Sequence, residues 1–271
     1  MSRPLWFVSL LKKSFPQRFR LARLTHLPVI GTLTEQSLFA EDDMVYLPSD
    51  RSIHIQEQIP HPDEFILPSS VVDYFIENAT LHWIMDFCIC RESSHCTDYP
   101  RDYGCIFLGE AVLKINPRLG RLVSKDEALK HARLCREAGL VHVIGRNKLD
   151  VMWLGAGPGD KLLTICSCCP CCCLWKVLPE ITPRIGLKVK RLPGVEVNVS
   201  ERCLGCGTCT EGTCFVDAIQ IVDGHAHIGI ECRGCGRCVE VCPNEAIELR
   251  ITTFDSVNQT IQRISKQVDV R

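Results

Sequence analysis

Hydrophobic residues recur with two periods along the first two thirds of the chain, and these periods predict alternating helices and strands. The clearest helix spans 124–138, where apolar residues fall at helical spacing. Ser124 and Glu127 form the capping box that marks its start. Short apolar runs at 140–144 and 162–165 predict strands. The pattern therefore favours a mixed α/β arrangement.

More polar stretches indicate the boundaries between parts of the chain. Residues 35–68 are rich in proline and acidic side chains, which predicts irregular structure with short strands, and a helix capped by Ser70 should follow. Residues 183–193 are rich in proline and basic side chains and read as a linker. The expected fold class is α+β, with a mixed α/β N-terminal domain of unknown topology. The expected divisions are an arm and irregular segment at 1–68, a cysteine-rich α/β domain at 69–190, a compact module at 194–250, and a helix or tail at 251–271.

Composition changes this picture through its cysteines. The chain has 271 residues, of which 46% are hydrophobic and 23% charged, and a net charge of −1 gives no case for nucleic-acid binding. The apolar run at 5–11 is too short to span a bilayer and has no cleavage site after it, so we expect a cytoplasmic location. Structural disulfides are rare in a reducing compartment. Metal binding is therefore the favoured explanation for 19 cysteines.

The first 34 residues carry six basic side chains and no acidic ones, with apolar residues between them. Such a segment can lie on a membrane surface or dock on an acidic partner. The preferred interpretation is an arm that packs on its own domain, because Pro4 and Pro16 limit any helix to about three turns.

Two regular cysteine runs follow residue 200. Three cysteines at two-residue gaps can wrap one face of a cubane cluster, and a fourth on a short helix can reach a second cluster. Strands are expected at 195–199 and 246–249, with a hairpin at 219–228 between the runs. Two such runs do not fit a pair of zinc sites. The runs are Cys203-x2-Cys206-x2-Cys209-x4-Cys214 and Cys232-x2-Cys235-x2-Cys238-x3-Cys242.

These runs and strands resemble the two-[4Fe–4S] bacterial-type ferredoxin domain over about residues 194–250. The resemblance implies a ferredoxin-like module with pseudo-twofold symmetry, two [4Fe–4S] clusters and crossed ligation. In that pattern one cluster takes Cys203, Cys206, Cys209 and Cys242, and the other takes Cys232, Cys235, Cys238 and Cys214. The first run departs from the family by one extra residue before Cys214 and by Phe215 where proline is usual, so a bulge is expected at Gly212 and Thr213.

Eleven cysteines lie outside these runs. Cys135 falls within a predicted helix and is expected to be an inert core residue. The other ten form two dense segments and could hold a third iron–sulfur cluster, form a redox-active dithiol, or pack as inert thiols. The first segment contains Cys88, Cys90, Cys96 and Cys105, and the second contains Cys166, Cys168, Cys169, Cys171, Cys172 and Cys173.

Strand alternation makes a finer prediction for the second segment. Successive side chains of an extended chain point to opposite faces. One face would carry Cys166, Cys168 and Cys172, and the other Cys169, Cys171 and Cys173, with Pro170 distorting the pattern.

The whole chain also resembles a group of [4Fe–4S]-binding proteins of anaerobic bacteria and archaea without a settled activity, through the segments 86–92 and 168–173. The expected function is relay of single electrons to a redox partner protein or to a further N-terminal cluster. The alternative is a ferredoxin-fed reductase with a cluster and thiol site for a disulfide or small molecule. Whether the chain is itself an enzyme is left open.

Overall fold

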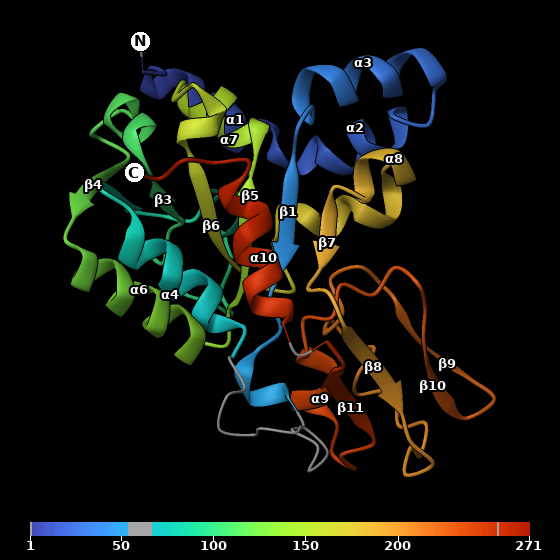
Figure 1. Cartoon of the computed structure of the whole chain (residues 1–271). Coiled ribbons are helices and arrows are strands. Elements are labelled where there is room, and N and C mark those ends of the chain that lie inside the picture. Colours follow the sequence, from blue (N-terminus) through green and yellow to red (C-terminus); the bar gives the residue numbers. More distant parts are fainter. Residues whose placement is uncertain (1, 54–66, 254) are drawn as a thin grey trace.

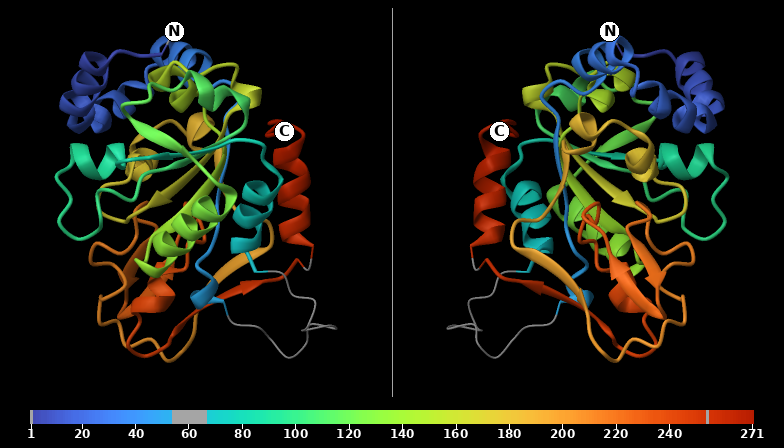
Figure 2. Two further views of the ribbon diagram at one scale, coloured as in Figure 1. Left: turned by 90° about the vertical axis from the view of Figure 1, so that its left-hand side faces the viewer. Right: turned by 90° about the vertical axis from the view of Figure 1, so that its right-hand side faces the viewer.

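The computed structural model describes residues 2–53, 67–253 and 255–271. The fold is α+β: helices surround a seven-stranded sheet, and a smaller module of two strand pairs lies at one end of it (Figure 1). The first three helices lie at the end of the molecule away from the module (Figure 2).

The large sheet has the strand order β4-β2-β3-β6-β5-β1-β7. Its pairs are antiparallel except for β1 with β7, which are parallel. The strands are β1 Asp43–Tyr46, β2 His82–Met85, β3 Ile106–Leu108, β4 Gly120–Val123, β5 Val141–Arg146, β6 Leu163–Cys168 and β7 Val189–Arg191. Since β2 and β6 both run antiparallel to β3, they are parallel to each other. Their carboxyl ends therefore lie on the same side of the sheet, next to the start of β3.

Helices cover both faces and the ends of this sheet. The α-helices are α1 Leu5–Ser14, α2 Arg18–Leu24, α3 Pro28–Leu38, α4 Ser69–Asn78, α5 Ile89–Ser93, α6 Lys125–Glu137, α7 Lys148–Leu154, α8 Pro183–Gly186, α9 Arg237–Val241 and α10 Ser256–Ser265. Short 3-10 helices are η1 Phe15–Gln17, η2 Asp50–Ser52, η4 Glu110–Lys114, η5 Gly159–Lys161 and η6 Leu174–Glu180. No helix in the described ranges has the length and apolar character needed to cross a bilayer.

The most periodic sequence patterns are confirmed. Helix α6 begins with the expected capping box, in which Ser124 and Glu127 satisfy each other's backbone N–H groups. Strands β5 and β6 also form where the apolar runs predicted them. The expected cap at Ser70 is wrong, because α4 begins at Ser69 and has no side-chain cap.

Two strands lie in the polar stretches, one of them among the short strands expected at 35–68 and the other in the predicted linker. Strand β1, within the acidic stretch, is fully buried between β5 and β7. The linker expected at 183–193 is wrong, because this stretch forms α8 and then β7 at the edge of the large sheet. Part of the predicted irregular segment, residues 54–66, lies outside the described residues.

The module is built from β8 Val195–Val199, β9 Ile219–Val222, β10 His225–Ile228 and β11 Ile247–Ile251. Strands β8 and β11 pair with each other, and β9 and β10 form the predicted hairpin. Helix α9 lies within the second cysteine run, just before Cys242, whereas the equivalent stretch of the first run forms turns, so the twofold repeat is incomplete. Leu249 and Val195 belong to the same apolar core as Val45 and Val71, so the module packs directly on the large domain.

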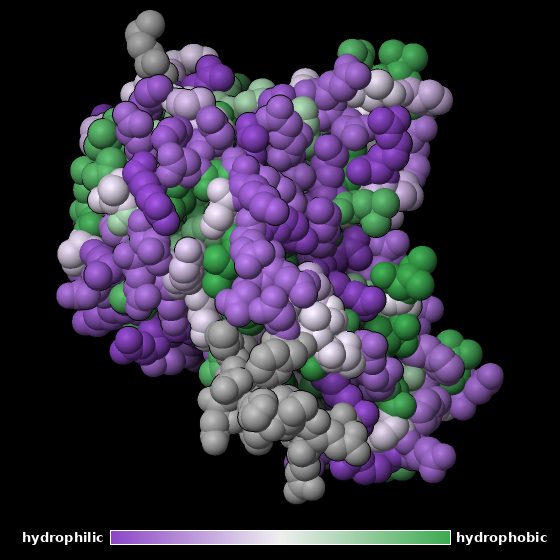
Figure 3. All heavy atoms as spheres, viewed as in Figure 1, coloured by the Kyte–Doolittle hydropathy of each residue, from purple (hydrophilic) through white to green (hydrophobic). Residues whose placement is uncertain are grey.

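The basic N-terminal segment packs on its own domain, as preferred above. Helix α1 ends before Pro16 and buries Val8 against the large sheet, and Arg23 pairs with Glu180 at 2.7 Å. Apolar side chains remain exposed on α3, among them Val29 and Leu33. Figure 3 shows such apolar surface over α3 and along the outer side of the module.

Candidate metal centres

The first hollow in the module is surrounded by cysteines that are far apart in sequence. Its lining includes Cys203, Cys206, Cys209 and Cys242, which is the set that crossed ligation requires. The Sγ atoms of Cys203 and Cys242 accept backbone N–H groups from Ala226 and Ala246, each at 3.3 Å. Such donors stabilise thiolate sulfur, so these residues suit an anionic iron–sulfur cluster.

The second hollow is lined by the remaining cysteines of the module, Cys214, Cys232, Cys235 and Cys238. Despite the extra residue before it, Cys214 accepts the N–H of Ala218 four residues on, at 3.3 Å. Cys242 makes the same contact with Ala246. Cys214 therefore holds the position equivalent to Cys242, and Gly212, with φ of +66°, absorbs the insertion.

Glycines between the module cysteines permit close backbone approach. Gly205 has φ of +65°, and a Cβ there would lie 2.3 Å from the carbonyl oxygen of Gly224. Gly236 has φ of +83°, and its Cβ would lie 1.9 Å from Ser52 Oγ. Both loops therefore need glycine, one within the module and the other where it meets the large domain.

The ten cysteines of the two dense N-terminal segments lie close to the carboxyl ends of strands β2 and β6 of the large sheet. The segment after β2 supplies Cys88, Cys90 and Cys96, and Cys105 directly precedes β3. The remaining six lie on β6 or just after it. The parallel course of β2 and β6 brings the two segments together, and their thiols sort into two groups.

The four-thiol group consists of Cys96, Cys169, Cys171 and Cys172. All four Sγ atoms lie within 4.8 Å of one another. The distances from Cys171 Sγ to the Sγ atoms of Cys96 and Cys172 are both 3.6 Å. His95 points to solvent and is not part of the group.

The six-thiol group is looser and consists of Cys88, Cys90, Cys105, Cys166, Cys168 and Cys173. Its thiols interact in a chain of pairs: Cys88 with Cys90, Cys105 with Cys166, and Cys168 with both Cys166 and Cys173. The Cys105 and Cys166 sulfurs are 3.5 Å apart. No three of these six described thiols meet the 4.8 Å limit that the four-thiol group satisfies.

The predicted division of the second segment by strand faces is wrong at its end. Cys172 joins Cys169 and Cys171, whereas Cys173 joins Cys166 and Cys168. Strand β6 stops at Cys168, and residues 170–172 form a turn, so side chains no longer alternate.

Arg91 lies between the two thiol groups and is completely buried. Its guanidinium donates to the carbonyl oxygens of Pro100 and Ser167, each at 2.7 Å, and of Tyr103. It forms no ion pair with any described carboxylate. Burial lowers its pKa, but the thiolate charges of Cys88, Cys169 and others outweigh this and raise it. Ionised sulfur is therefore the natural counter-charge of this buried cation.

Two more cations face the same thiols. Arg237, next to Cys238 of the module, donates to the carbonyl oxygen of Cys168, and its Nε is buried without a partner. Arg18 of α2 also has a buried, unpartnered Nε. Burial lowers the Arg18 pKa, and Cys90 and Cys173 oppose that shift. The thiol groups thus lie in an environment built for negative charge.

Aromatic side chains connect the module to the six-thiol group. Phe215, next to Cys214, stacks on Tyr46 with ring centroids 4.5 Å apart. The Tyr46 hydroxyl lies 3.5 Å from Cys173 Sγ. Burial raises the Tyr46 pKa, and the neighbouring thiol of Cys173 raises it further, so the phenol stays protonated. Both rings belong to one apolar core with Cys168 and Cys173.

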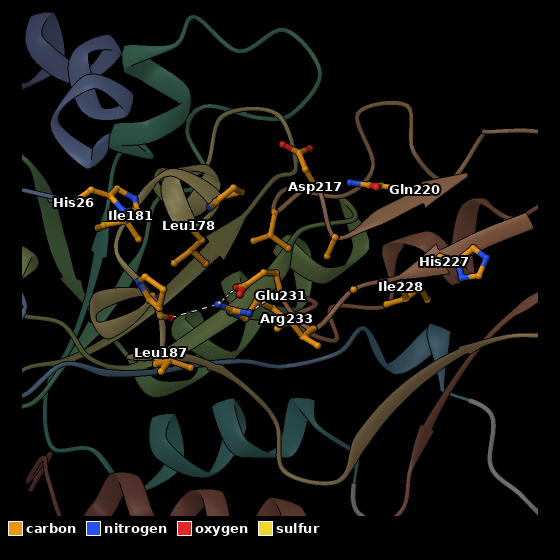
Figure 4. A pocket seen from close by; sticks show the side chains of 17 residues that line it. His26, Leu178, Ile181, Leu187, Asp217, Gln220, His227, Ile228, Glu231 and Arg233 are labelled. Atoms are coloured by element: carbon orange, nitrogen blue, oxygen red, sulfur yellow. Dashed lines mark hydrogen bonds and ion pairs between the residues drawn. The ribbon is translucent and has the colours of Figure 1, made fainter. Parts of the chain in front are cut away.

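A cleft of about 650 Å³ lies where the module meets η6 and α8. Figure 4 shows His26, Leu178 and Leu187 on one side, and His227, Glu231 and Arg233 on the other. Arg233 pairs with Glu231 at 3.1 Å. No cysteine lines this cleft, so it is separate from the thiol sites.

Comparison with known proteins agrees with the cysteine geometry. Residues 195–252 match the family of 4Fe-4S dicluster domains. This part of the chain is therefore an iron–sulfur domain, and the protein binds an iron–sulfur cofactor. No curated protein and no solved structure matches the chain.

The sequence analysis identified the cysteines as candidate ligands, but it did not identify the buried residues that contact them. Arg91, Arg237 and Tyr46 come from three different parts of the chain. An arginine beside Cys90 was a signal, because a cation next to a thiol favours the thiolate. Cys135 is fully buried, and desolvation raises its pKa to about 11, which fits the inert role expected for it.

Proposed function

We propose that this chain is an electron-transfer protein whose ferredoxin module, carrying two [4Fe–4S] clusters, serves a redox site at the six-thiol group. The clusters would supply one-electron transfer at low potential. The crossed sets of cysteines would hold them. The six-thiol group would hold a third iron–sulfur cluster, because it offers more than the four thiolates that a cubane needs.

The contact between Phe215, Tyr46 and Cys173 carries the proposal. It joins a residue adjacent to a module ligand to a thiol of the N-terminal domain without intervening solvent. Arg237 adds a second connection from α9 to Cys168. A module that only exchanged electrons with external partners would not need its second hollow buried against another thiol site.

The opposite side of the module is open. Cys206 is exposed, and Leu204 beside it is 75% exposed. A redox partner protein that approaches here meets an apolar side chain next to a ligand, which suits transient docking. Electrons would therefore enter or leave at Cys206, and the buried side would face the six-thiol group.

The test is a reductive titration of the full-length protein prepared without oxygen. The two module clusters should take up about two electrons, and the six-thiol site should take up more. Cys105→Ser should remove the additional uptake, because Cys105 belongs to the six-thiol group, while Cys135→Ser should leave it unchanged. Equal uptake by the wild type and Cys105→Ser would contradict the proposal.

A second candidate is a reductase that acts on a disulfide or small molecule at the same site. The observation that favours it is that two of these thiols have a lowered pKa. A hydrogen bond from Cys90 lowers the pKa of Cys88 to about 7, and hydrogen bonds from Cys166 and Cys173 lower the pKa of Cys168. Thiolates are the nucleophiles of disulfide exchange. Labelling of one or two of these thiols in the iron-loaded protein would support this candidate.

A further inference from the structure

The four-thiol group differs in dimensions from the sites that bind cubanes. A single ion with metal–sulfur bonds of about 2.3 Å places its four sulfurs about 3.8 Å apart, at the corners of a tetrahedron. The two separations of 3.6 Å from Cys171 Sγ, with all four sulfurs within 4.8 Å of one another, match that tetrahedron.

In a cubane, each cysteine binds a different iron, and inorganic sulfides lie between the irons. The cysteine sulfurs are therefore farther apart than around one ion. The module illustrates this within the same molecule: none of its eight described cysteines belongs to a group as tight as the four-thiol group. In the six-thiol group, Cys105 and Cys166 form a close pair, but no three of its described thiols lie as close together as those of the four-thiol group.

We propose that the four-thiol group binds one tetrahedrally coordinated metal ion, zinc or iron, and no cubane. This inference does not depend on the electron transfer proposed above. Four thiolates saturate a tetrahedral ion and leave no position for substrate, which is typical of structural sites.

The surroundings of the group suit such an ion. Three of the four residues are buried, with Cys169 exposed by 1%, Cys172 by 6% and Cys96 by 7%. The N–H of Cys172 donates to Cys169 Sγ at 3.3 Å. Four thiolates around a divalent ion leave a net negative charge, and buried Arg91 lies beside Cys169 to offset part of it.

The ion would join the two cysteine segments. Cys96 comes from the segment after β2, whereas the other three ligands follow β6. The same two segments carry the six-thiol group. A single ion here would fix the segments against each other and so hold those six thiols in place.

The test compares metal with acid-labile sulfide in the full-length protein prepared without oxygen. In [4Fe–4S] clusters iron and sulfide are equal, whereas a single thiolate-bound ion adds metal without sulfide. Cys171→Ser and Cys96→Ser should each lose about one metal ion per chain and no sulfide. Cys135→Ser, a buried thiol outside both groups, should lose neither.

Elemental analysis of the lost ion distinguishes zinc from iron. Cobalt exchanged into the wild type should give the visible absorption bands of a tetrahedral tetrathiolate site. This measurement needs no variant, so the proposal can be tested even if both variants fail to fold. Loss of about four irons together with about four sulfides in Cys171→Ser would overturn the proposal in favour of a cubane. Rapid labelling of Cys171 in the wild type as isolated would overturn it in favour of free thiols.

Discussion

At the scale of single residues, buried charge decides how the thiol sites are organised. Arg91 has no exposed surface, and its partners are three carbonyl groups and the thiols on either side. Its positive charge is balanced when the thiols are ionised by metal. Arg91 and the metal should therefore stabilise each other.

Replacing Arg91 with methionine tests this coupling. The change should lower the free energy of unfolding of the metal-loaded protein by about 3 kcal/mol or more, because carbonyls lose donors and thiolates lose their cation. Denaturant titration without oxygen gives the measurement. Arg133→Met on the exposed surface of α6 is the matched control, expected to stay within about 0.5 kcal/mol. Equal stability of the two variants would contradict the role of Arg91.

A second residue-scale prediction concerns crossed ligation. Cys242→Ser should disturb the same cluster as Cys206→Ser, because both residues line the first hollow. Cys214→Ser should instead reproduce the effect of Cys235→Ser. Electron paramagnetic resonance of the reduced full-length variants compares the signals that disappear. If the Cys242→Ser spectrum resembles that of Cys235→Ser, ligation is not crossed.

The resemblance to two-cluster ferredoxin domains predicts the two crossed sets in the module, and the members of each set line one hollow. Cysteine spacing was not enough to divide the other ten thiols. Their grouping depends on where β6 stops and on the approach of the segment after β2, both of which are tertiary effects. The exchange of Cys172 and Cys173 between groups follows from one turn that no alternation rule contains.

At the scale of elements, the sequence predicted a helix or strand correctly where the residues that define it are close together in the chain. The capping box of α6 needs only Ser124 and Glu127, and it formed as expected. Strands β1 and β7 have just four and three residues, and they exist because neighbours complete them. Strand β7, with only three residues, carries too little periodicity to be recognised from sequence.

Helix α6 offers a prediction at this scale. Ser124→Ala removes the side-chain acceptor for the Glu127 N–H and should cost about 1 kcal/mol in the free energy of unfolding. Urea denaturation followed by circular dichroism measures the difference. Lys125→Ala, which leaves the box intact, should change little. A Ser124→Ala variant as stable as the wild type would show that the cap contributes nothing here.

At the scale of the whole molecule, the module and the large sheet share one apolar core. Leu192, Val195 and Leu249 pack in the same cluster as Val45 and Val71. Ser49 also donates its N–H to the carbonyl oxygen of Cys235, at 3.2 Å. The two parts should therefore unfold together.

This cooperativity can be measured by two probes of one urea titration without oxygen. Loss of visible iron–sulfur absorbance reports on the metal sites, and far-ultraviolet circular dichroism is dominated by the helices of the large domain. The two transitions should coincide. If the iron–sulfur absorbance is lost completely at a urea concentration where the circular dichroism is still that of the native protein, the module unfolds independently.

The chain returns to the large domain after it has built the module. Helix α10 packs on α4, the carbonyl oxygen of Val270 accepts the N–H of Thr80 at 3.1 Å, and Asp269 pairs with Lys161 at 2.6 Å. On the ribosome, the large domain therefore stays unfinished until the iron-binding loops have been translated. Until α10 has been synthesised, α4 lacks the helix that packs on it, so a chain cut off before residue 256 should leave part of α4 open to proteases.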